Sequence, residues 1–244
     1  MERDINHVKI IDDIDNLGRE LTKVIQNGNN NKRLLISSDL LLKTRCNVSI
    51  LPHIAELRNS TTSINLIYRA IMLDLMTALF LLHLPDDRFE YSCKVLDVGH
   101  VKFMKDILPM RLELARRVCN PQEGEDIDEQ KLFDQYYDNF KDYLDSEKGE
   151  PWRIINLEPP KNFKFNGSIK SIYEYLKNCN ENENLKALSN LYMYYRYLSQ
   201  TEHYSFLGNK YPFKTEYDDS WYKECNIAIY VGIDELSYLI RQYY

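Results

Sequence analysis

The stretch that most restricts the fold is the run "INLIYRAIMLDLMTALFLLHL" at residues 64–84, which is apolar on nearly every side of a helix. A helix of this length that is apolar all round is buried, either in a protein core or in a membrane. Arg69, Asp74 and His83 interrupt the run, and a membrane span tolerates few such charges. The sequence therefore predicts a buried core helix and no membrane partner.

The rest of the chain also follows a helical period. Its 244 residues include only eight glycines and eight prolines, and no series of alternating strands with tight-turn dipeptides occurs. Hydrophobic residues make up 44% and charged residues 28%, so the chain can bury a sizeable core. We therefore expect an all-α protein, a single-domain multi-helix bundle over residues 1–244.

Glycines and prolines mark one long break in the helical pattern. Residues 148–167 contain Gly149, Pro151, Pro159, Pro160 and Gly167, which predicts a long extended crossover. The segments after this crossover are too few to form a core of their own, which is why one domain is expected. The expected helices cover about residues 4–26, 33–45, 53–59, 64–84, 86–118, 126–145, 168–178, 184–203 and 220–243.

Charge and cysteine usage restrict the class of protein. Residues 121–150 contain eleven acids and three lysines, so of the net charge of −6 this segment carries −8 and the remainder +2. A basic groove outside this segment therefore remains available for nucleic acid. The five scattered cysteines form no C-x-x-C pair, which indicates reduced thiols in the cytoplasm and no zinc site. We expect no metal and no cofactor.

The segment "RYLSQTEH" at residues 196–203 is the strongest candidate site. At about 100° per residue, Arg196, Ser199 and His203 fall on the same side of the expected helix as Leu185 and Leu188. This predicts that the three polar residues extend a buried apolar face. A buried cation needs a partner, so the face should meet a carboxylate, a second subunit or an anionic ligand.

A purely structural role for this segment is the first alternative. Arg196 would pair with an internal acid, for which Asp74 and Glu113 are both candidates. His203 would cap the carbonyl groups at the end of the helix. The sequence does not choose between these acids.

An arginine, six intervening residues and a histidine on a late helix of an all-α protein resemble the motif of the HEPN superfamily. A second, shorter point of resemblance is "YRAIMLD", which places Arg69 and Asp74 in the central apolar helix. The two matches cover two helices, and the remaining length agrees only in being helical.

The resemblance implies a specific chemistry. In catalytic HEPN members two subunits bring their motifs together in a cleft, and the histidine moves protons while an RNA 2′-hydroxyl attacks the neighbouring phosphate without a metal. By position, Arg196 would hold the phosphate and His203 would act as acid and base, supported by Ser199, Asp74 and Arg69. An imidazole and a guanidinium suit these two roles. Catalytic members usually carry a polar residue after the arginine, where this sequence has Tyr197.

The resemblance thus implies an RNA-directed protein of a toxin or defence system. It would be a metal-independent endoribonuclease or a relative that only binds RNA. The expected partners are RNA, a second copy in a homodimer, and an antitoxin or another defence-system protein. The alternative from another class is a non-catalytic helical interaction or scaffold protein in which the Arg–Ser–His cluster is structural.

Overall fold

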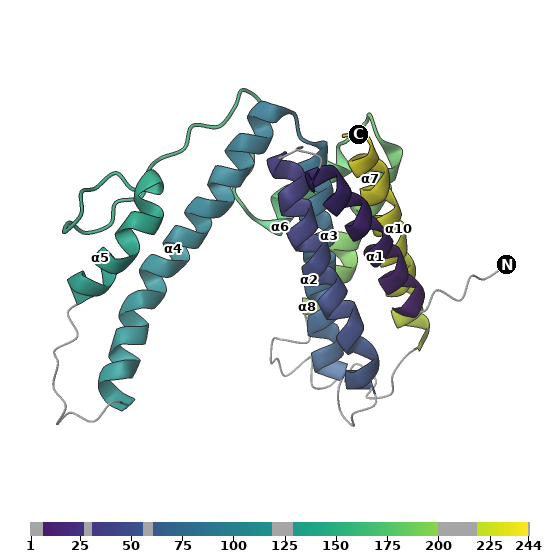
Figure 1. The fold of residues 1–244 in the computed structure, drawn as a ribbon, viewed down its shortest axis with the longest axis horizontal. Helices are drawn as coiled ribbons and strands as arrows, with labels where there is room; N and C mark the ends of the chain where they lie inside the picture. Colours follow the sequence, from purple (N-terminus) through teal and green to yellow (C-terminus); the bar gives the residue numbers. More distant parts are fainter. Residues whose placement is uncertain (1–6, 27–30, 56–60, 119–128, 200–218, 244) are drawn as a thin grey trace. The chain divides into compact units, whose positions relative to one another are not determined.

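The computed structural model describes residues 7–26, 31–55, 61–118, 129–199 and 219–243 (Figure 1). Helices account for 81% of these described residues, and their only β-structure is one isolated bridge. The prediction of an all-α protein is confirmed.

The chain divides into two compact units. Unit 1 comprises the described residues of Met1–Leu84 and Ser168–Tyr244, and unit 2 lies within Pro85–Gly167. The predicted crossover near 148–167 contains no helix and forms the last part of unit 2. Gly149 and Gly167 there adopt φ angles of 92° and 80°, a left-handed backbone that favours glycine. The expectation of one domain over 1–244 stays a prediction.

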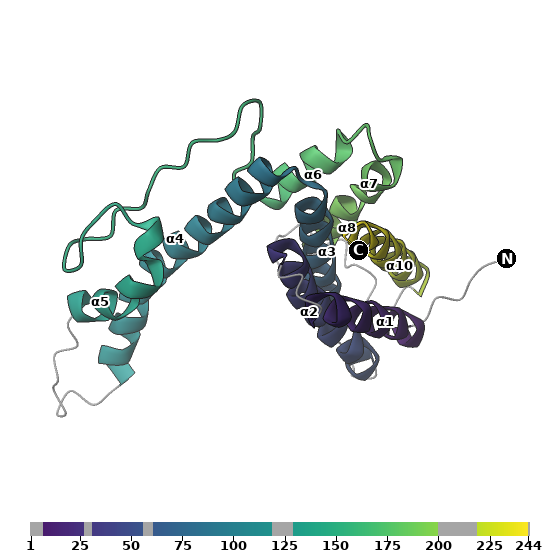
Figure 2. The ribbon, with the colours of Figure 1, turned by 45° about the horizontal axis from the view of Figure 1, so that its top comes forward.

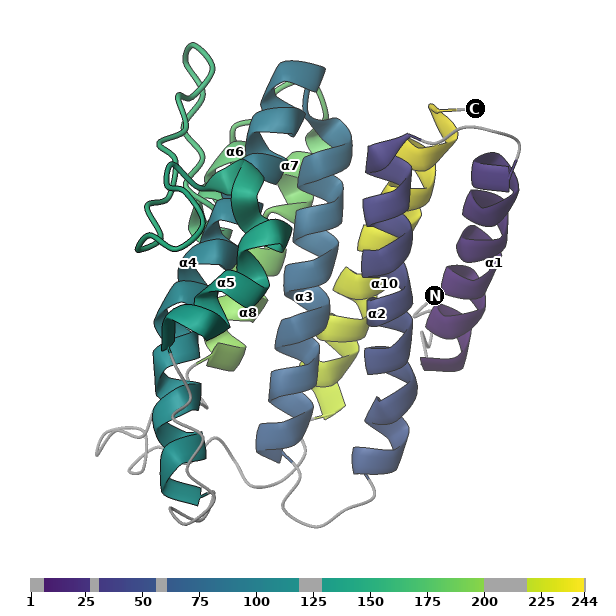
Figure 3. The ribbon, with the colours of Figure 1, turned by 60° about the vertical axis from the view of Figure 1, so that its left-hand side comes forward.

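Unit 1 is built around the apolar helix found in the sequence. This helix, α3, packs against α2, α6, α8 and α10, while α1 packs against α2 and α10. Figure 3 shows α1, α2 and α3 as neighbouring helices with α10 behind α2. The helices of the unit are α1 (His7–Gln26), α2 (Lys32–Ala55), α3 (Thr61–His83), α6 (Ile169–Lys177), α7 (Glu183–Leu188), α8 (Leu191–Ser199) and α10 (Asp219–Arg241).

The burial predicted for α3 is confirmed. Leu75 and Leu79 are 1% and 0% exposed, and most of the helix is inaccessible to solvent. By length and composition alone, Ser63–His83 is also the one described helix that could cross a membrane, and 67% of its most apolar window is buried inside the structure. The core helix of a bundle passes the same test.

Buried polar side chains fix the register of α3 against α10. The Tyr68 hydroxyl donates to the Asn226 side-chain oxygen at 2.8 Å, and the Tyr222 hydroxyl donates to that of Asn65 at 2.9 Å. The two tyrosine rings stack with centroids 5.3 Å apart. Because buried polar groups are costly without partners, these bonds favour one alignment of the two helices.

The first helices follow the predicted pattern with one correction. Helix α1 forms within the predicted range and buries one apolar side. The prediction of two separate short helices over 33–45 and 53–59 is wrong. Residues Lys32–Ala55 form one helix, α2, that continues past Pro52. Val48 and Leu51 of this helix are buried, and α2 packs against both α1 and α3. Tertiary packing overrides the local break signals. Residues 56–59 lie outside the described residues.

The described helices of unit 2 are α4 (Asp86–Val118), α5 (Glu129–Phe140) and a short 3₁₀ turn, η2 (Lys141–Tyr143). Figure 2 shows α5 lying against α4. The apolar side of α5 packs onto a cluster of Val101, Leu108, Leu144 and Trp152.

The helix predicted over 126–145 is longer than α5. After η2 the chain turns back on itself, because Leu144 forms an isolated bridge with Ile154. The Asp145 N–H donates to the Arg153 carbonyl at 2.7 Å. Pairing with the crossover therefore replaces the last helical turn. Residues 126–128 lie outside the described residues.

Candidate functional site

The single helix predicted over 184–203 is interrupted. Helix α7 ends at Leu188, residues Ser189 and Asn190 form a turn, and α8 begins at Leu191. The Ser189 hydroxyl donates to the Lys186 carbonyl at 2.7 Å. Serine and asparagine favour such local bonds over a continuous helix. The side chains of α8 therefore do not continue the helical wheel of α7.

The predicted continuation of the buried face is therefore wrong for Arg196. On α8 the buried residues are Leu191 and Leu198, whereas Arg196 is exposed and Ser199 is half-buried. The Ser199 hydroxyl donates to the carbonyl of Arg196 at 2.7 Å. His203 lies outside the described residues, so its place on the same side as Arg196 and Ser199 stays a prediction.

Three half-buried tyrosines stack next to this exposed arginine. The Tyr173 and Tyr192 rings have centroids 4.5 Å apart at an interplanar angle of 19°. The Tyr192 and Tyr195 rings follow with centroids 6.2 Å apart at 12°. Tyr173 lies on α6 and the other two on α8. We call these three residues the tyrosine ladder.

Each rung of the tyrosine ladder carries one cation. The Arg69 guanidinium of α3 lies 4.9 Å from the Tyr195 ring centre and donates to its hydroxyl at 3.1 Å. The Lys177 ammonium lies 5.5 Å from the Tyr173 ring.

Arg196 belongs to the middle rung. Its guanidinium lies 5.9 Å from the Tyr192 ring centre, and its Nη1 donates to the Tyr192 hydroxyl at 3.4 Å. These contacts raise the pKa of Arg196. Cation–π contacts and hydrogen bonds thus hold Arg69 and Arg196 against the rings.

Asp74, the other predicted supporting residue, belongs to a different contact. It accepts a hydrogen bond from Lys43 at 2.8 Å and is 3% exposed. Its Oδ2 has no hydrogen-bond partner. Burial raises the pKa of Asp74, and Lys43 opposes this effect by lowering it. Arg69 and Arg196 therefore both contact the tyrosine ladder, whereas Asp74 pairs with Lys43 of α2.

The tyrosine ladder presents hydrogen-bond donors to an anion. Each guanidinium donates one N–H to a tyrosine oxygen, and a guanidinium carries five N–H donors in all. Arg69–Tyr195 and Arg196–Tyr192 form two such donor pairs, and the stacked rings between them set their separation. Planar guanidinium donors match the oxygens of phosphate groups.

Four members of this site, Tyr192, Tyr195, Tyr173 and Lys177, are not among the site residues predicted from the sequence. The spacing of four residues between Tyr173 and Lys177 on one helix signals a contact between these two. However, nothing in the sequence indicates that α6 lies beside α8. The pairing of Tyr192 with Arg196 has the same spacing and could have been found.

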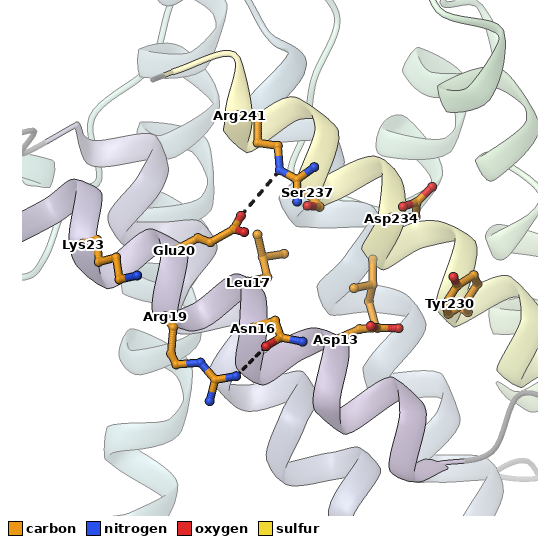
Figure 4. Close-up of a pocket in the computed structure, with 11 residues that line it drawn as sticks. Asp13, Asn16, Leu17, Arg19, Glu20, Lys23, Tyr230, Asp234, Ser237 and Arg241 are labelled. Atoms are coloured by element: carbon orange, nitrogen blue, oxygen red, sulfur yellow. Dashed lines mark hydrogen bonds and ion pairs between the residues drawn. The ribbon is translucent and has the colours of Figure 1, made fainter.

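A separate cavity of about 430 Å³ lies between α1 and α10 (Figure 4). Acids and bases alternate along its walls, and Arg241 pairs with Glu20 across it at 3.5 Å. Asp13 and Asp234 lie toward one end. None of the residues predicted from the sequence as site residues lines this cavity, and its charges are balanced, so the tyrosine ladder is the stronger candidate.

The comparisons add no further information on family. No family model, curated protein or solved structure matches this chain. In the part of the chain that the structure describes, no group of three or more His, Cys, Asp or Glu residues is arranged to hold a metal ion. HEPN membership stays a prediction that rests on the Arg-x6-His and "YRAIMLD" segments.

Proposed function

We propose that this protein is RNA-directed and binds single-stranded RNA on the tyrosine ladder. The observation that carries the proposal is the two arginine–tyrosine pairs, Arg69–Tyr195 and Arg196–Tyr192, joined by ring stacking. Adjacent phosphates of one strand would bind these two pairs. Arginine next to aromatic rings is a common way of holding single-stranded nucleic acid.

The exposure of Arg196 supports this proposal over the scaffold alternative. In a purely structural cluster the arginine would be buried against an acid. Here Arg196 is exposed and contacts Tyr192, and the buried acid Asp74 is paired with Lys43. The cation is thus available to an anionic ligand.

Cleavage is the further step that the HEPN resemblance implies. His203 would take the proton of the attacking 2′-hydroxyl and return one to the leaving 5′-oxygen, while Arg196 would offset the charge that develops on the phosphate. A homodimer and an antitoxin or defence-system partner belong to the same proposal. Binding without cleavage is the alternative, because Tyr197 follows the arginine.

The test is the affinity for a single-stranded RNA oligonucleotide as a function of salt concentration. Each phosphate that the protein neutralises on binding releases counterions and contributes about −0.7 to the slope of log association constant against log salt concentration for a single strand. With Arg69, Arg196 and Lys177 in contact, the slope should be about −2. Arg196→Gln and Arg69→Gln should each lower the affinity and reduce the slope by about 0.7.

A matched control is Lys186→Gln on α7, since Lys186 pairs with Glu183 of its own helix at 3.7 Å. This variant should bind RNA as the parent protein does. Double-stranded RNA should bind more weakly than the single strand. No measurable binding to any RNA, or equal losses from Lys186→Gln and Arg196→Gln, would reject the proposal and favour the scaffold alternative.

A further inference from the structure

Helix α4 carries apolar residues on two opposite sides. One side packs onto α5 through Val101, Met104 and Leu108, within the cluster that includes Trp152. The other side is formed by Phe103, Ile107, Met110 and Leu114, which we call the 103–114 stripe. The cluster on α5 accounts for only the first of these two sides.

Three of the four residues of the 103–114 stripe are exposed. Phe103, Met110 and Leu114 are 56%, 65% and 61% exposed, and Ile107 between them is half-buried. At about 100° per residue all four fall within a sector of about 60°. Contiguous exposed apolar residues of this kind mark interaction surfaces.

The spacing of the 103–114 stripe is that of a coiled-coil contact. The intervals of four, three and four residues place Ile107 and Leu114 at a positions and Phe103 and Met110 at d positions of a heptad. Half-buried Leu96 continues the d series by one further heptad. Pro109, which lacks a backbone N–H, falls at a c position outside the stripe.

The two edges of the stripe carry opposite charges. Asp106 lies about 70° to one side of the stripe and Arg111 about 70° to the other. Both are exposed, and neither has an ion-pair partner among the described residues. With Ile107 at an a position, Asp106 occupies the g position just before it, and Arg111 occupies the e position of the next heptad. In a parallel helix pair, a g residue meets the e residue five positions later on the partner helix.

We propose that the 103–114 stripe binds the same stripe of a second copy of this chain, with the two α4 helices parallel. Met110 then meets Met110 of the partner subunit, and Asp106 pairs with the partner's Arg111 twice by symmetry. Such self-complementarity is what a twofold dimer interface requires. The proposal concerns a surface of unit 2 and is independent both of RNA binding and of the motif cleft that the HEPN resemblance implies.

Sedimentation equilibrium of the full chain over a range of concentrations tests the proposal. The parent protein should show a monomer–dimer equilibrium, and Met110→Lys should raise the dissociation constant by roughly tenfold or more. Since Met110 is exposed, the variant should melt as the parent does. Ile227→Lys on α10 is the matched control, because Ile227 is an exposed apolar residue of unit 1, 47% exposed. This control should leave the dissociation constant unchanged.

A charge exchange separates this pairing from other apolar contacts. Asp106→Arg alone and Arg111→Asp alone should each weaken the dimer through like-charge contacts. The double variant Asp106→Arg/Arg111→Asp should restore it. Oxidation of Met110→Cys should give a crosslink between two peptides that both contain position 110, as identified by mass spectrometry.

Three results would overturn the proposal. The first is a full chain that stays monomeric at every concentration, which would leave the stripe to a different protein. The second is a dimer that Met110→Lys does not weaken. The third is a double charge variant that stays as weak as the single variants, or no crosslink at position 110, either of which would exclude parallel pairing.

Discussion

The guanidinium of Arg69 on α3 lies 4.9 Å from the ring centre of Tyr195 on α8 and donates a hydrogen bond to its hydroxyl at 3.1 Å. The two residues are 126 positions apart in the sequence. This contact connects the central core helix to the exposed side of α8. It therefore places a cation of the core helix beside Arg196.

Tyr195→Phe tests whether this hydroxyl positions Arg69 for an RNA phosphate. The ring and its cation–π contact remain, but the oxygen that accepts from Arg69 is lost. We expect RNA affinity to fall by about fivefold, close to the effect of one hydrogen bond of about 1 kcal/mol. Fluorescence anisotropy with a labelled single-stranded RNA measures the change.

Tyr197→Phe is the control for the same chemistry on the same helix, because Tyr197 is exposed and outside the tyrosine ladder. It should bind RNA as the parent does. If both phenylalanine variants matched the parent, the Tyr195 hydroxyl would have no part in RNA binding.

The central helix gives a prediction about stability. Leu75→Ala and Leu79→Ala each remove a side chain that is almost completely buried. Each should lower the free energy of unfolding by roughly 2–5 kcal/mol, through lost transfer energy and the cavity that remains. Urea unfolding followed by far-ultraviolet circular dichroism measures this loss. Leu66→Ala on the same helix, where Leu66 is 41% exposed, should cost much less.

The fold was predictable wherever burial alone decides structure. The apolar run at 64–84 and the buried residues of α1, such as Ile10 and Leu21, needed no knowledge of their neighbours. The start of α6 was also predicted, at Ser168. The Ser168 Oγ accepts a hydrogen bond from the Ser171 N–H at 3.2 Å and caps the helix. Periodicity and capping depend on residues that are close together in the sequence, so they can be recognised without a structure.

The candidate site was less predictable because it depends on which helices lie together. The turn at Ser189 and Asn190 separates α8 from α7. Because of this break, Arg196 is exposed, whereas a continuous helix would have placed it on the buried side. The stacking of Tyr173 on Tyr192 joins two helices that no local pattern connects. Likewise, α2 continues past Pro52 because its packing against α3 outweighs the local signal.

Asp74 leads to a prediction about pH. Burial raises its pKa, and its Oδ2 is buried without a hydrogen-bond partner. A carboxyl with a raised folded-state pKa is tolerated below its ordinary pKa and costs stability as the pH rises through the folded-state value. Asp74→Asn should therefore be more stable than the parent at pH 7. This advantage should shrink as the pH falls to about 4, near the ordinary pKa of aspartate.

Thermal melts of both proteins across that pH range measure the difference. Lys43→Gln serves as the companion variant, since it removes the partner that lowers the pKa of Asp74. It should be less stable than the parent at pH 7. An Asp74→Asn protein that is less stable than the parent at pH 7 would mean that the Lys43 ion pair outweighs the cost of burial.

Unit 2 provides a prediction about stability at alkaline pH. The Tyr143 hydroxyl donates to the Asp97 carboxylate at 2.6 Å, and this bond raises the pKa of Tyr143 to about 12. Stability from a raised tyrosine pKa is fully present below the unfolded-state value of about 10 and disappears as the pH rises through about 12. Tyr143→Phe should cost about 1 kcal/mol at pH 7. An ultraviolet titration should show one fewer phenol ionising near pH 12, and an unchanged titration would refute the assignment.

The last prediction concerns cleavage by the Arg-x6-His segment. If His203 is the acid–base group, the purified protein should cut single-stranded RNA in the presence of a chelator and leave cyclic phosphate ends. His203→Ala should slow the cutting by about 10²–10⁴-fold, which is the usual contribution of a positioned acid–base group. Arg196→Ala should weaken both binding and cleavage.

Stability measured on the same variants separates catalysis from a structural role. Because Arg196 is exposed and contacts Tyr192 of its own helix, Arg196→Ala should melt as the parent does. A large fall in the melting temperature, together with no cleavage by the parent, would support the structural alternative. RNA binding that depends on Arg196 and persists in His203→Ala without any cleavage by the parent would identify a binding protein that has kept the phosphate contact and lacks the reaction.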